Sequence, residues 1–118
     1  MGQPFLKIRP VVDAQAGQIY WTGEFGPAVS RARLDGSEAA PLIDYAQSAS
    51  RGIGLDGRNG RLYWSDGRHE AVMTANSDGS DLTTLLVRRL DSGAGLAFDP
   101  LDDKIYWADI ASDMISRA

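Results

Sequence analysis

Leu62-Tyr63-Trp64-Ser65-Asp66 is one of three closely related strings in this chain. The other two are Ile19-Tyr20-Trp21-Thr22-Gly23 and Ile105-Tyr106-Trp107-Ala108-Asp109, and neighbouring strings lie 43 residues apart. All three tryptophans of the protein fall in these strings. The same spacing relates Asp13 to Asp56 and Asp56 to Asp99. One supersecondary unit is therefore repeated along the chain.

The length of the unit matches a β-propeller blade, which is a four-stranded antiparallel sheet that needs a neighbour on each face. Each unit contains short runs of alternating, β-branched and aromatic residues separated by Asp- and Gly-containing turns, which predicts strands a to d. In the first unit, strand d is expected at Ala40 to Tyr45, and in the second, strand a is expected at Ile53 to Asp56. We therefore expect an all-β fold, with three four-stranded blades in a single domain over residues 1–118. The blade units should cover about 11–52, 53–94 and 95–118.

The third unit ends after its third expected strand, Met114 to Ala118, whereas an extra strand-like run at residues 4–8 precedes the first unit. Closed propellers have about 4 to 8 blades, so three blades cannot close a ring. We expect two chains to complete a six-bladed propeller as a homodimer. Phe5 to Ile8 of each chain would pair with Met114 to Ala118 of the other. The alternative is that these 118 residues are a piece of a longer six-bladed chain.

Composition narrows the possible partners. The chain is 43% hydrophobic and 24% charged, as is usual for a globular protein, and its net charge is -4. That charge argues against a nucleic-acid partner, which requires clustered Lys and Arg. No apolar run has the length of a membrane span, and no signal-type segment begins the chain, so we expect no membrane association. The absence of cysteine slightly favours the cytoplasm but does not fix the location.

These strings give the chain a resemblance to the YWTD repeats, also called low-density-lipoprotein receptor class B repeats, which form six-bladed β-propellers. The resemblance also rests on Gly-Leu-Ala-Phe-Asp at residues 95–99 and Ala-Asn-Ser-Asp-Gly-Ser at 75–80. Gly23, Ser65 and Ala108 depart from the motif. Members of the family mostly bind protein ligands on one face of the disc, so the resemblance implies binding before catalysis. The cysteine-rich modules that accompany animal members are absent, which argues against an extracellular receptor role.

Most candidates for chemistry have a structural interpretation. Asp66 and Asp109 are expected to cap backbone N–H groups where strand b ends, and Asp13, Asp56 and Asp99 to begin tight turns. The carboxylates at 99, 102 and 103 lack the EF-hand pattern, so no metal is expected. The glycine-rich run at 52–57 fails as a dinucleotide site because a strand follows it. His69 is the only histidine, and no nucleophile or zinc pattern accompanies it. We expect no cofactor.

Large side chains that do not recur with the repeat are available for binding, and Phe25 and Tyr45 are the clearest of them. Both lie in or beside b-to-c and d-to-a connections, which emerge on one face of a propeller. Exposed aromatic and Arg side chains are typical of binding anchors. The predicted ligand-binding residues are Phe25, Tyr45, Arg51, Arg68, His69 and Arg88. Alternatively, Phe25 and Tyr45 fill the seams between blades.

The sequence thus predicts a non-enzymatic binding or scaffold propeller that holds a protein, peptide or glycan on its loop face. A second hypothesis is a hydrolase of the six-bladed lactonase or esterase type, with polar groups in the central channel. Such enzymes need several polar ligands where the a strands begin, and here those positions are mostly apolar. A third is a structural subunit in which Phe25 and Tyr45 are buried against another protein.

Overall fold

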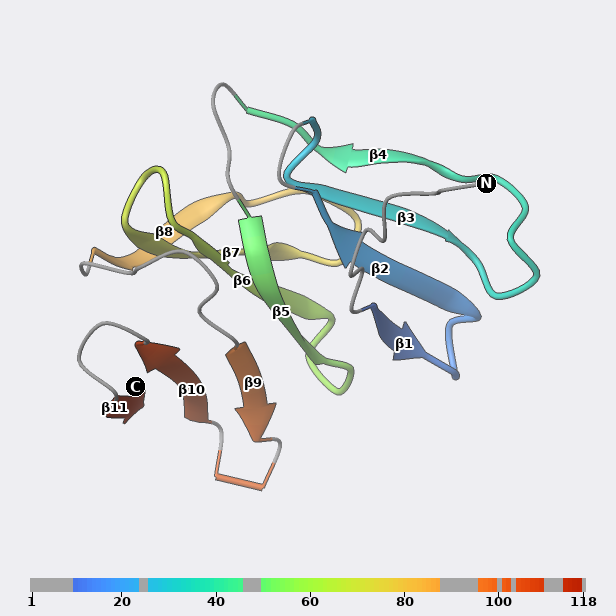
Figure 1. The fold of residues 1–118 in the computed structure, drawn as a ribbon. Helices are drawn as coiled ribbons and strands as arrows, with labels where there is room; N and C mark the ends of the chain where they lie inside the picture. Colours follow the sequence, from blue (N-terminus) through green and yellow to red (C-terminus); the bar gives the residue numbers. More distant parts are fainter. Residues whose placement is uncertain are drawn as a thin grey trace, which may run out of the picture.

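The computed structural model describes residues 10–23, 26–45, 50–87, 96–99, 101–102, 104–109 and 114–117. In these residues the regular structure consists of β-strands alone (Figure 1). The strands are β1 (Val11–Asp13), β2 (Gln18–Thr22), β3 (Val29–Arg33), β4 (Ala40–Ile43), β5 (Ser50–Asp56), β6 (Arg61–Asp66), β7 (Ala71–Asn76), β8 (Thr83–Val87), β9 (Leu96–Asp99), β10 (Lys104–Asp109) and β11 (Met114–Arg117).

The strands form three antiparallel sheets in which each strand pairs with the next one in sequence. The first sheet has the order β1-β2-β3-β4, the second β5-β6-β7-β8, and the third contains β9, β10 and β11. We call them blades 1, 2 and 3. Figure 1 shows the three blades following one another, with β1, β5 and β9 on the inner side of the arc. The predicted meander of four short strands is therefore confirmed in blades 1 and 2.

Two strand boundaries differ from the prediction by more than one residue. β5 begins at Ser50 rather than at Ile53, and its pairing with β6 shifts register between these two residues. A β-bulge therefore lengthens this strand beyond the run of alternating residues. β4 ends at Ile43, so Tyr45 lies outside the strand in which the sequence placed it. The expected strand at Phe5 to Ile8 lies outside the described residues.

The a-to-b turns are held by the repeated aspartates, as expected. In each turn the Asp carboxylate accepts a hydrogen bond from a backbone N–H two or three residues later. The backbone N–H of Ala16 donates to Asp13 at 3.1 Å, that of Asn59 donates to Asp56 at 3.2 Å, and that of Leu101 donates to Asp99 at 3.0 Å. Because these bonds are local, the repeat fixes where each hairpin turns.

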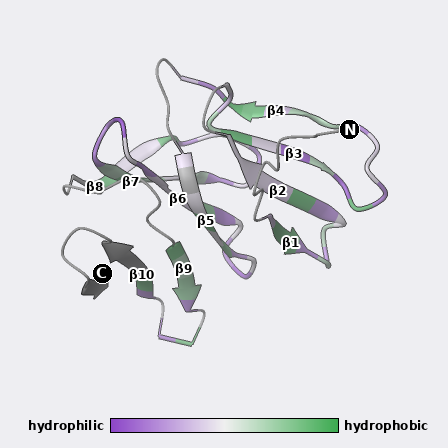
Figure 2. Cartoon of the chain, in the orientation of Figure 1, coloured by the Kyte–Doolittle hydropathy of each residue, from purple (hydrophilic) through white to green (hydrophobic). Residues whose placement is uncertain are grey.

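Apolar side chains fill the seams between successive blades. The seam between blades 1 and 2 contains Tyr20 and Val29 from blade 1, and Leu62 and Trp64 from blade 2. The seam between blades 2 and 3 contains Val72, Tyr63, Ile105, Leu96 and Phe98. Figure 2 shows hydrophobic colouring along strands such as β4 and β9, and hydrophilic colouring on the connecting turns. Each blade is therefore stabilised by its neighbours, as sheets with two apolar faces require.

Candidate functional site

The predicted site lies at the end of the blades where strand b leads to c and strand d leads to a. We call this the loop face. Of the six predicted residues, the structure brings Tyr45, Arg68 and His69 together, and they surround Asp66. Phe25 and Arg88 lie outside the described residues. Arg51 belongs to β5, and its side chain is not among the described ones.

Asp66 is the fixed point of this group. It is the last residue of β6, and its exposed fraction is 0%. Its Oδ1 accepts hydrogen bonds from the backbone N–H groups of Arg68 at 3.0 Å and His69 at 3.2 Å. The expectation that this carboxylate caps the end of strand b is confirmed. These bonds hold the backbone on which the Arg68 and His69 side chains stand, and both residues are exposed.

Tyr45 joins blade 1 to this fixed point. Its hydroxyl donates to Asp66 Oδ2 at 2.6 Å and accepts from Trp64 Nε1 at 3.0 Å. Burial raises the pKa of the Tyr45 phenol, and the hydrogen bond to Asp66 raises it further. The phenol therefore stays protonated and remains a donor at neutral pH. This geometry corresponds to the second interpretation of Tyr45, in which the ring fills a seam.

His69 completes the group at the surface. Its ring meets the Tyr45 ring edge to face, with centroids 5.5 Å apart and an interplanar angle of 62°. Its Nε2 lies 4.0 Å from Asp66 Oδ2, which is within ion-pair range when the imidazole is protonated. The loop face thus presents an imidazole beside a partly buried phenol, and the exposed Arg68 precedes His69 in the same turn. Such groups can donate to carboxylate, carbonyl or hydroxyl oxygens.

Ser65 has a role that the sequence reasoning missed. Its side chain is buried, and its Oγ accepts a hydrogen bond from the Gly52 backbone N–H at 3.0 Å, across the bulged start of β5. The signal was present in the sequence, because Ser65 stands where the YWTD motif has Thr. A hydroxyl at this position accepts from the Gly52 N–H, which the bulge removes from the regular backbone hydrogen bonding between β5 and β6.

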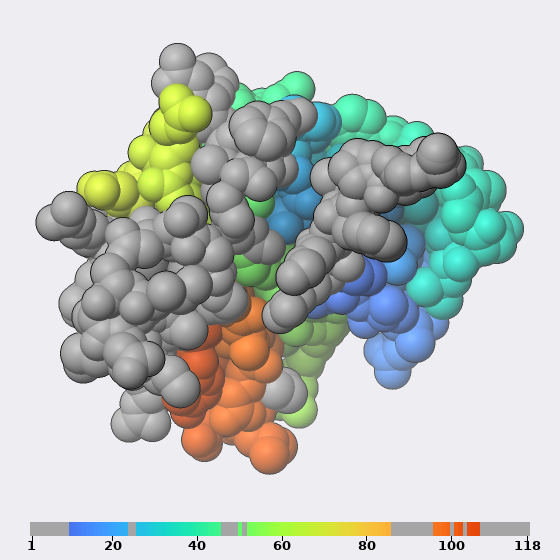
Figure 3. Space-filling model, viewed as in Figure 1, coloured from blue at the N-terminus to red at the C-terminus, as the bar shows by residue number. Residues whose placement is uncertain are grey.

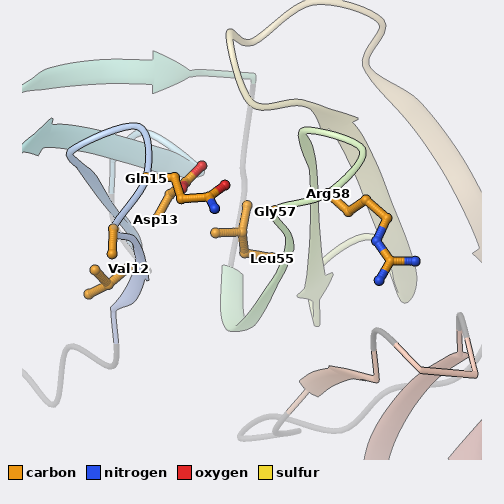
Figure 4. Close-up of a pocket in the computed structure, with 7 residues that line it drawn as sticks. Val12, Asp13, Gln15, Leu55, Gly57 and Arg58 are labelled. Carbon is orange, nitrogen blue, oxygen red and sulfur yellow. The ribbon is translucent and has the colours of Figure 1, made fainter.

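A groove lies on the opposite side of the blades, at the β1–β2 and β5–β6 turns, and we call this side the turn face. The groove is open and has a volume of about 520 Å³. Its lining residues are Val12, Asp13, Ala14, Gln15, Leu55, Gly57 and Arg58. Figure 4 shows Gln15 reaching from its turn toward the space beside Leu55, with Arg58 directed away from it. The sequence prediction did not include this groove. One feature of the sequence pointed to this groove. The repeat position in the a-to-b turn is not kept, since it is Gln15 in the first unit, Arg58 in the second and Leu101 in the third.

The described residues show two further features of the surface. They contain no cluster of three or more His, Asp or Glu side chains arranged to hold a metal ion. In the same part of the chain, no helix has the length and apolar character needed to cross a membrane.

Three consecutive antiparallel sheets with apolar seams are the blades of a partial β-propeller. The repeat that builds them is also identified by sequence, since residues 60–100 match the family low-density lipoprotein receptor repeat class B. The chain therefore carries a YWTD repeat, and the resemblance predicted from the Tyr-Trp strings is confirmed. No curated protein sequence matches the chain.

Solved structures support the same assignment. A chain in the crystal structure of the nidogen/laminin complex aligns with a TM-score of 0.78 and 28% identity, covering 86% of this chain and 40% of that one. An auxiliary nutrient binding protein from Bacteroides thetaiotaomicron gives 0.72 and 18%, covering 93% of this chain and 28% of its own. A catalytically inactive virginiamycin B lyase from Staphylococcus aureus gives 0.69 and 19%, covering 100% and 43%. The last two show the fold alone. This chain spans less than half the length of each structure.

Proposed function

We propose that this chain is a non-enzymatic binding propeller whose loop face holds a protein, peptide or glycan. The observation that carries the proposal is the arrangement around Asp66. A buried carboxylate fixes the backbone of Arg68 and His69, both of which are exposed, and the His69 ring lies against the Tyr45 ring. A backbone that is ordered before binding loses less conformational entropy when a ligand arrives.

Two further observations favour binding over hydrolysis. The relative with 28% identity was crystallised in a complex of nidogen with laminin, which is a protein–protein complex. The second observation concerns the inner strands, where a channel enzyme needs converging polar groups. Among the described residues, β1 begins with Val11 and Val12, the centre of β5 reads Ile53-Gly54-Leu55, and β9 begins with Leu96 and Ala97. These positions supply apolar side chains rather than acids, bases or metal ligands, and Val11, Ile53, Leu55 and Leu96 pack in the seams between blades.

The proposal includes assembly from two copies, because closed propellers have about 4 to 8 blades and two sets of three blades make a ring of six. Residues 4–8 would then add the fourth strand beside Met114 to Ala118 of the other copy. The same residues have an alternative place at the start of the first strand of blade 1. Lys7 lies one repeat before Ser50, and Ser50 is the residue at which β5, the first strand of blade 2, begins. Deleting residues 1–8 separates the two: loss of the dimer supports strand exchange, whereas a retained dimer overturns it.

Binding can be tested with defined probes. Immobilised protein is exposed to a displayed library of random peptides and, separately, to a glycan array, and the selected ligands are measured by titration. We expect Arg68→Glu to weaken a selected ligand at least tenfold, because the anchor charge is reversed while the backbone bond to Asp66 remains. Arg58→Glu is the matched control, since Arg58 is also exposed but lies on the turn face.

Two outcomes would overturn the proposal. One is the absence of any saturable ligand among the probes. The other is a set of ligands that lose affinity on Arg58→Glu and keep it on Arg68→Glu, which would move the binding site to the groove of the turn face. A circular dichroism spectrum of each variant shows that the fold is unchanged.

A further inference from the structure

The two seams inside the chain follow one rule. The side of a blade that faces the next blade carries a Tyr from strand b and a Val from strand c, as in Tyr20 with Val29 and Tyr63 with Val72. We call this the forward face. The side that faces the previous blade carries apolar residues from strands a and b, namely Leu55 with Leu62 in blade 2 and Phe98 with Ile105 in blade 3. We call this the backward face.

The rule is most direct in the second seam. There the Tyr63 ring of blade 2 stacks on the Phe98 ring of blade 3, with centroids 5.4 Å apart and the planes inclined by 7°. Val72 and Ile105 are both buried in the same cluster. The repeat therefore pairs a forward Tyr with the a-strand residue of the next blade, and a forward Val with its b-strand residue.

Blade 1 has a backward face that no other blade of this chain covers in the described residues. Its members are Val12, Ile19 and Trp21, which occupy the repeat positions of Leu55, Leu62 and Trp64. Leu62 and Trp64 have exposed fractions of 0%, whereas Val12 is 53% exposed and Ile19 and Trp21 are half-buried. Figure 3 shows blade 1 and blade 3 on opposite sides of the green turn of blade 2. The difference in exposure follows the position in the arc, because the residue types are similar.

The forward face of blade 3 has the matching residues. Tyr106 is half-buried and occupies the position of Tyr20 and Tyr63, and Ile115 occupies that of Val29 and Val72 in the sequence. Blades 1 and 3 therefore carry the two halves of the seam that the chain uses twice inside. A second copy of the same chain supplies both halves at once, and a two-fold arrangement uses each of them.

We infer that a second copy docks its blade 3 on the backward face of blade 1 in the register of the internal seams. Val12 then lies against Tyr106 of the second copy, and Ile19 lies against the β11 strand that carries the repeat position of Val29 and Val72. This inference rests on the proposed dimer and adds the residues that meet in it. The ring contains two such seams, one at each end of the arc.

A polar contact supports the same register. In the first seam, Arg31 Nη1 donates to the Ser77 backbone carbonyl at 3.4 Å. Two repeats later the sequence again has an arginine, Arg117, and one repeat before Ser77 it has Leu34. In sequence, Arg117 and Leu34 therefore hold the repeat positions of the donor and the acceptor at the inferred seam. The second internal seam has Thr74 at the donor position.

The absence of cysteine makes the register directly testable. The variant Val12→Cys with Tyr106→Cys is treated with a short bis-maleimide, and the products are separated under denaturing conditions. We expect a covalent species of twice the chain mass. The pair Tyr63→Cys with Phe98→Cys calibrates the reaction, because these positions face each other within one chain. The pair Val12→Cys with Leu82→Cys is the negative control, since Leu82 is exposed beside β8 of blade 2.

The solution mass of the untreated wild-type protein separates the possible failures. A dimer whose 12/106 pair does not cross-link, although the 63/98 pair does, overturns the register and leaves the proposed dimer standing. A monomer at micromolar concentration overturns both. Equal cross-linking of the 12/106 and 12/82 pairs indicates random encounters and also overturns the register.

Discussion

At the scale of single residues, the Tyr45 hydroxyl connects two blades, and its loss should be measurable. Tyr45→Phe leaves Asp66 Oδ2 and Trp64 Nε1 without this partner, and both residues have an exposed fraction of 0%. A buried polar group that loses its partner costs about 1–3 kcal/mol. We expect the free energy of unfolding to fall by about that amount in urea titrations.

The control for this variant is Thr83→Val. Thr83 also loses a hydroxyl that makes one hydrogen bond, to the Asp81 carbonyl at 3.1 Å, but the residue is exposed. Water replaces the lost partner there, so the change should stay within about 0.5 kcal/mol. Equal losses in the two variants would show that the Tyr45 hydroxyl has no special role between the blades.

A second prediction at this scale concerns pH. Hydrogen bonds from the Ser80 hydroxyl and backbone N–H lower the pKa of Asp78, and Ser37 does the same for Asp35. A carboxylate with a lowered folded-state pKa stabilises the fold above its unfolded pKa of about 3.9, and this contribution is lost as pH falls through the folded-state pKa. Ser80→Ala should raise the pKa of Asp78 toward its ordinary value.

Carboxylate titration by NMR checks this directly, with Asp35 as the internal reference. The pKa of Asp35 should not change, because its own serine is untouched. If the Asp78 carboxylate titrates at the same pH in the variant and the wild type, the hydroxyl bond at 2.5 Å is not what lowers its pKa.

At the scale of strands, the inner strands β5 and β9 approach closely because of one glycine. A Cβ added at Gly54 would lie 3.0 Å from Leu96 Cδ2 and 3.2 Å from the Phe98 backbone nitrogen. Gly54→Ala should therefore push blades 2 and 3 apart and lower the free energy of unfolding by about 1–3 kcal/mol. Gly57→Ala is the matched control, because an added Cβ there meets nothing within 4 Å. A loss at Gly57 as large as at Gly54 would refute the packing explanation.

The strands were largely predictable from the sequence because their signals are local. Alternation and the turn aspartates depend on residues only a few positions apart, and β2, β6 and β10 were found through their Tyr-Trp pairs. The start of β5 was missed because the bulge between Ser50 and Ile53 interrupts the alternation. Sequence periodicity cannot register a bulge, because the extra residues pair with no regular partner.

The candidate site was only partly predictable, for a different reason. Tyr45 was singled out because it does not recur with the repeat, but the sequence did not reveal its partner Asp66, which lies 21 residues away in another blade. Contacts across a seam depend on how blades stack, which no local pattern reports. The repeat nevertheless contained a hint, because Arg88 holds the position of Tyr45 and Asp109 that of Asp66 in the next unit. The same two repeat positions therefore carry a hydrogen-bond donor and a carboxylate in both units.

At the scale of the whole molecule, the exposed backward face of blade 1 links stability to association. If the seam between copies contributes as the internal seams do, folding and dimerisation are coupled, and the midpoint of thermal unfolding, Tm, must rise with protein concentration. A tenfold increase adds about 1.4 kcal/mol to the dimer, which corresponds to a rise in Tm of about 3 to 5 °C.

Scanning calorimetry between low and high micromolar concentrations measures this shift. The control is a single polypeptide made of two copies joined by a flexible Gly/Ser linker, in which the seam partner is always present. Its Tm should be independent of concentration and at least as high as that of the wild-type chain. Trp21→Ala should abolish the dependence in the wild-type background by weakening the seam. A wild-type Tm that does not change over the same range would mean that three blades are stable alone, and the exposure of Val12 would then need another explanation.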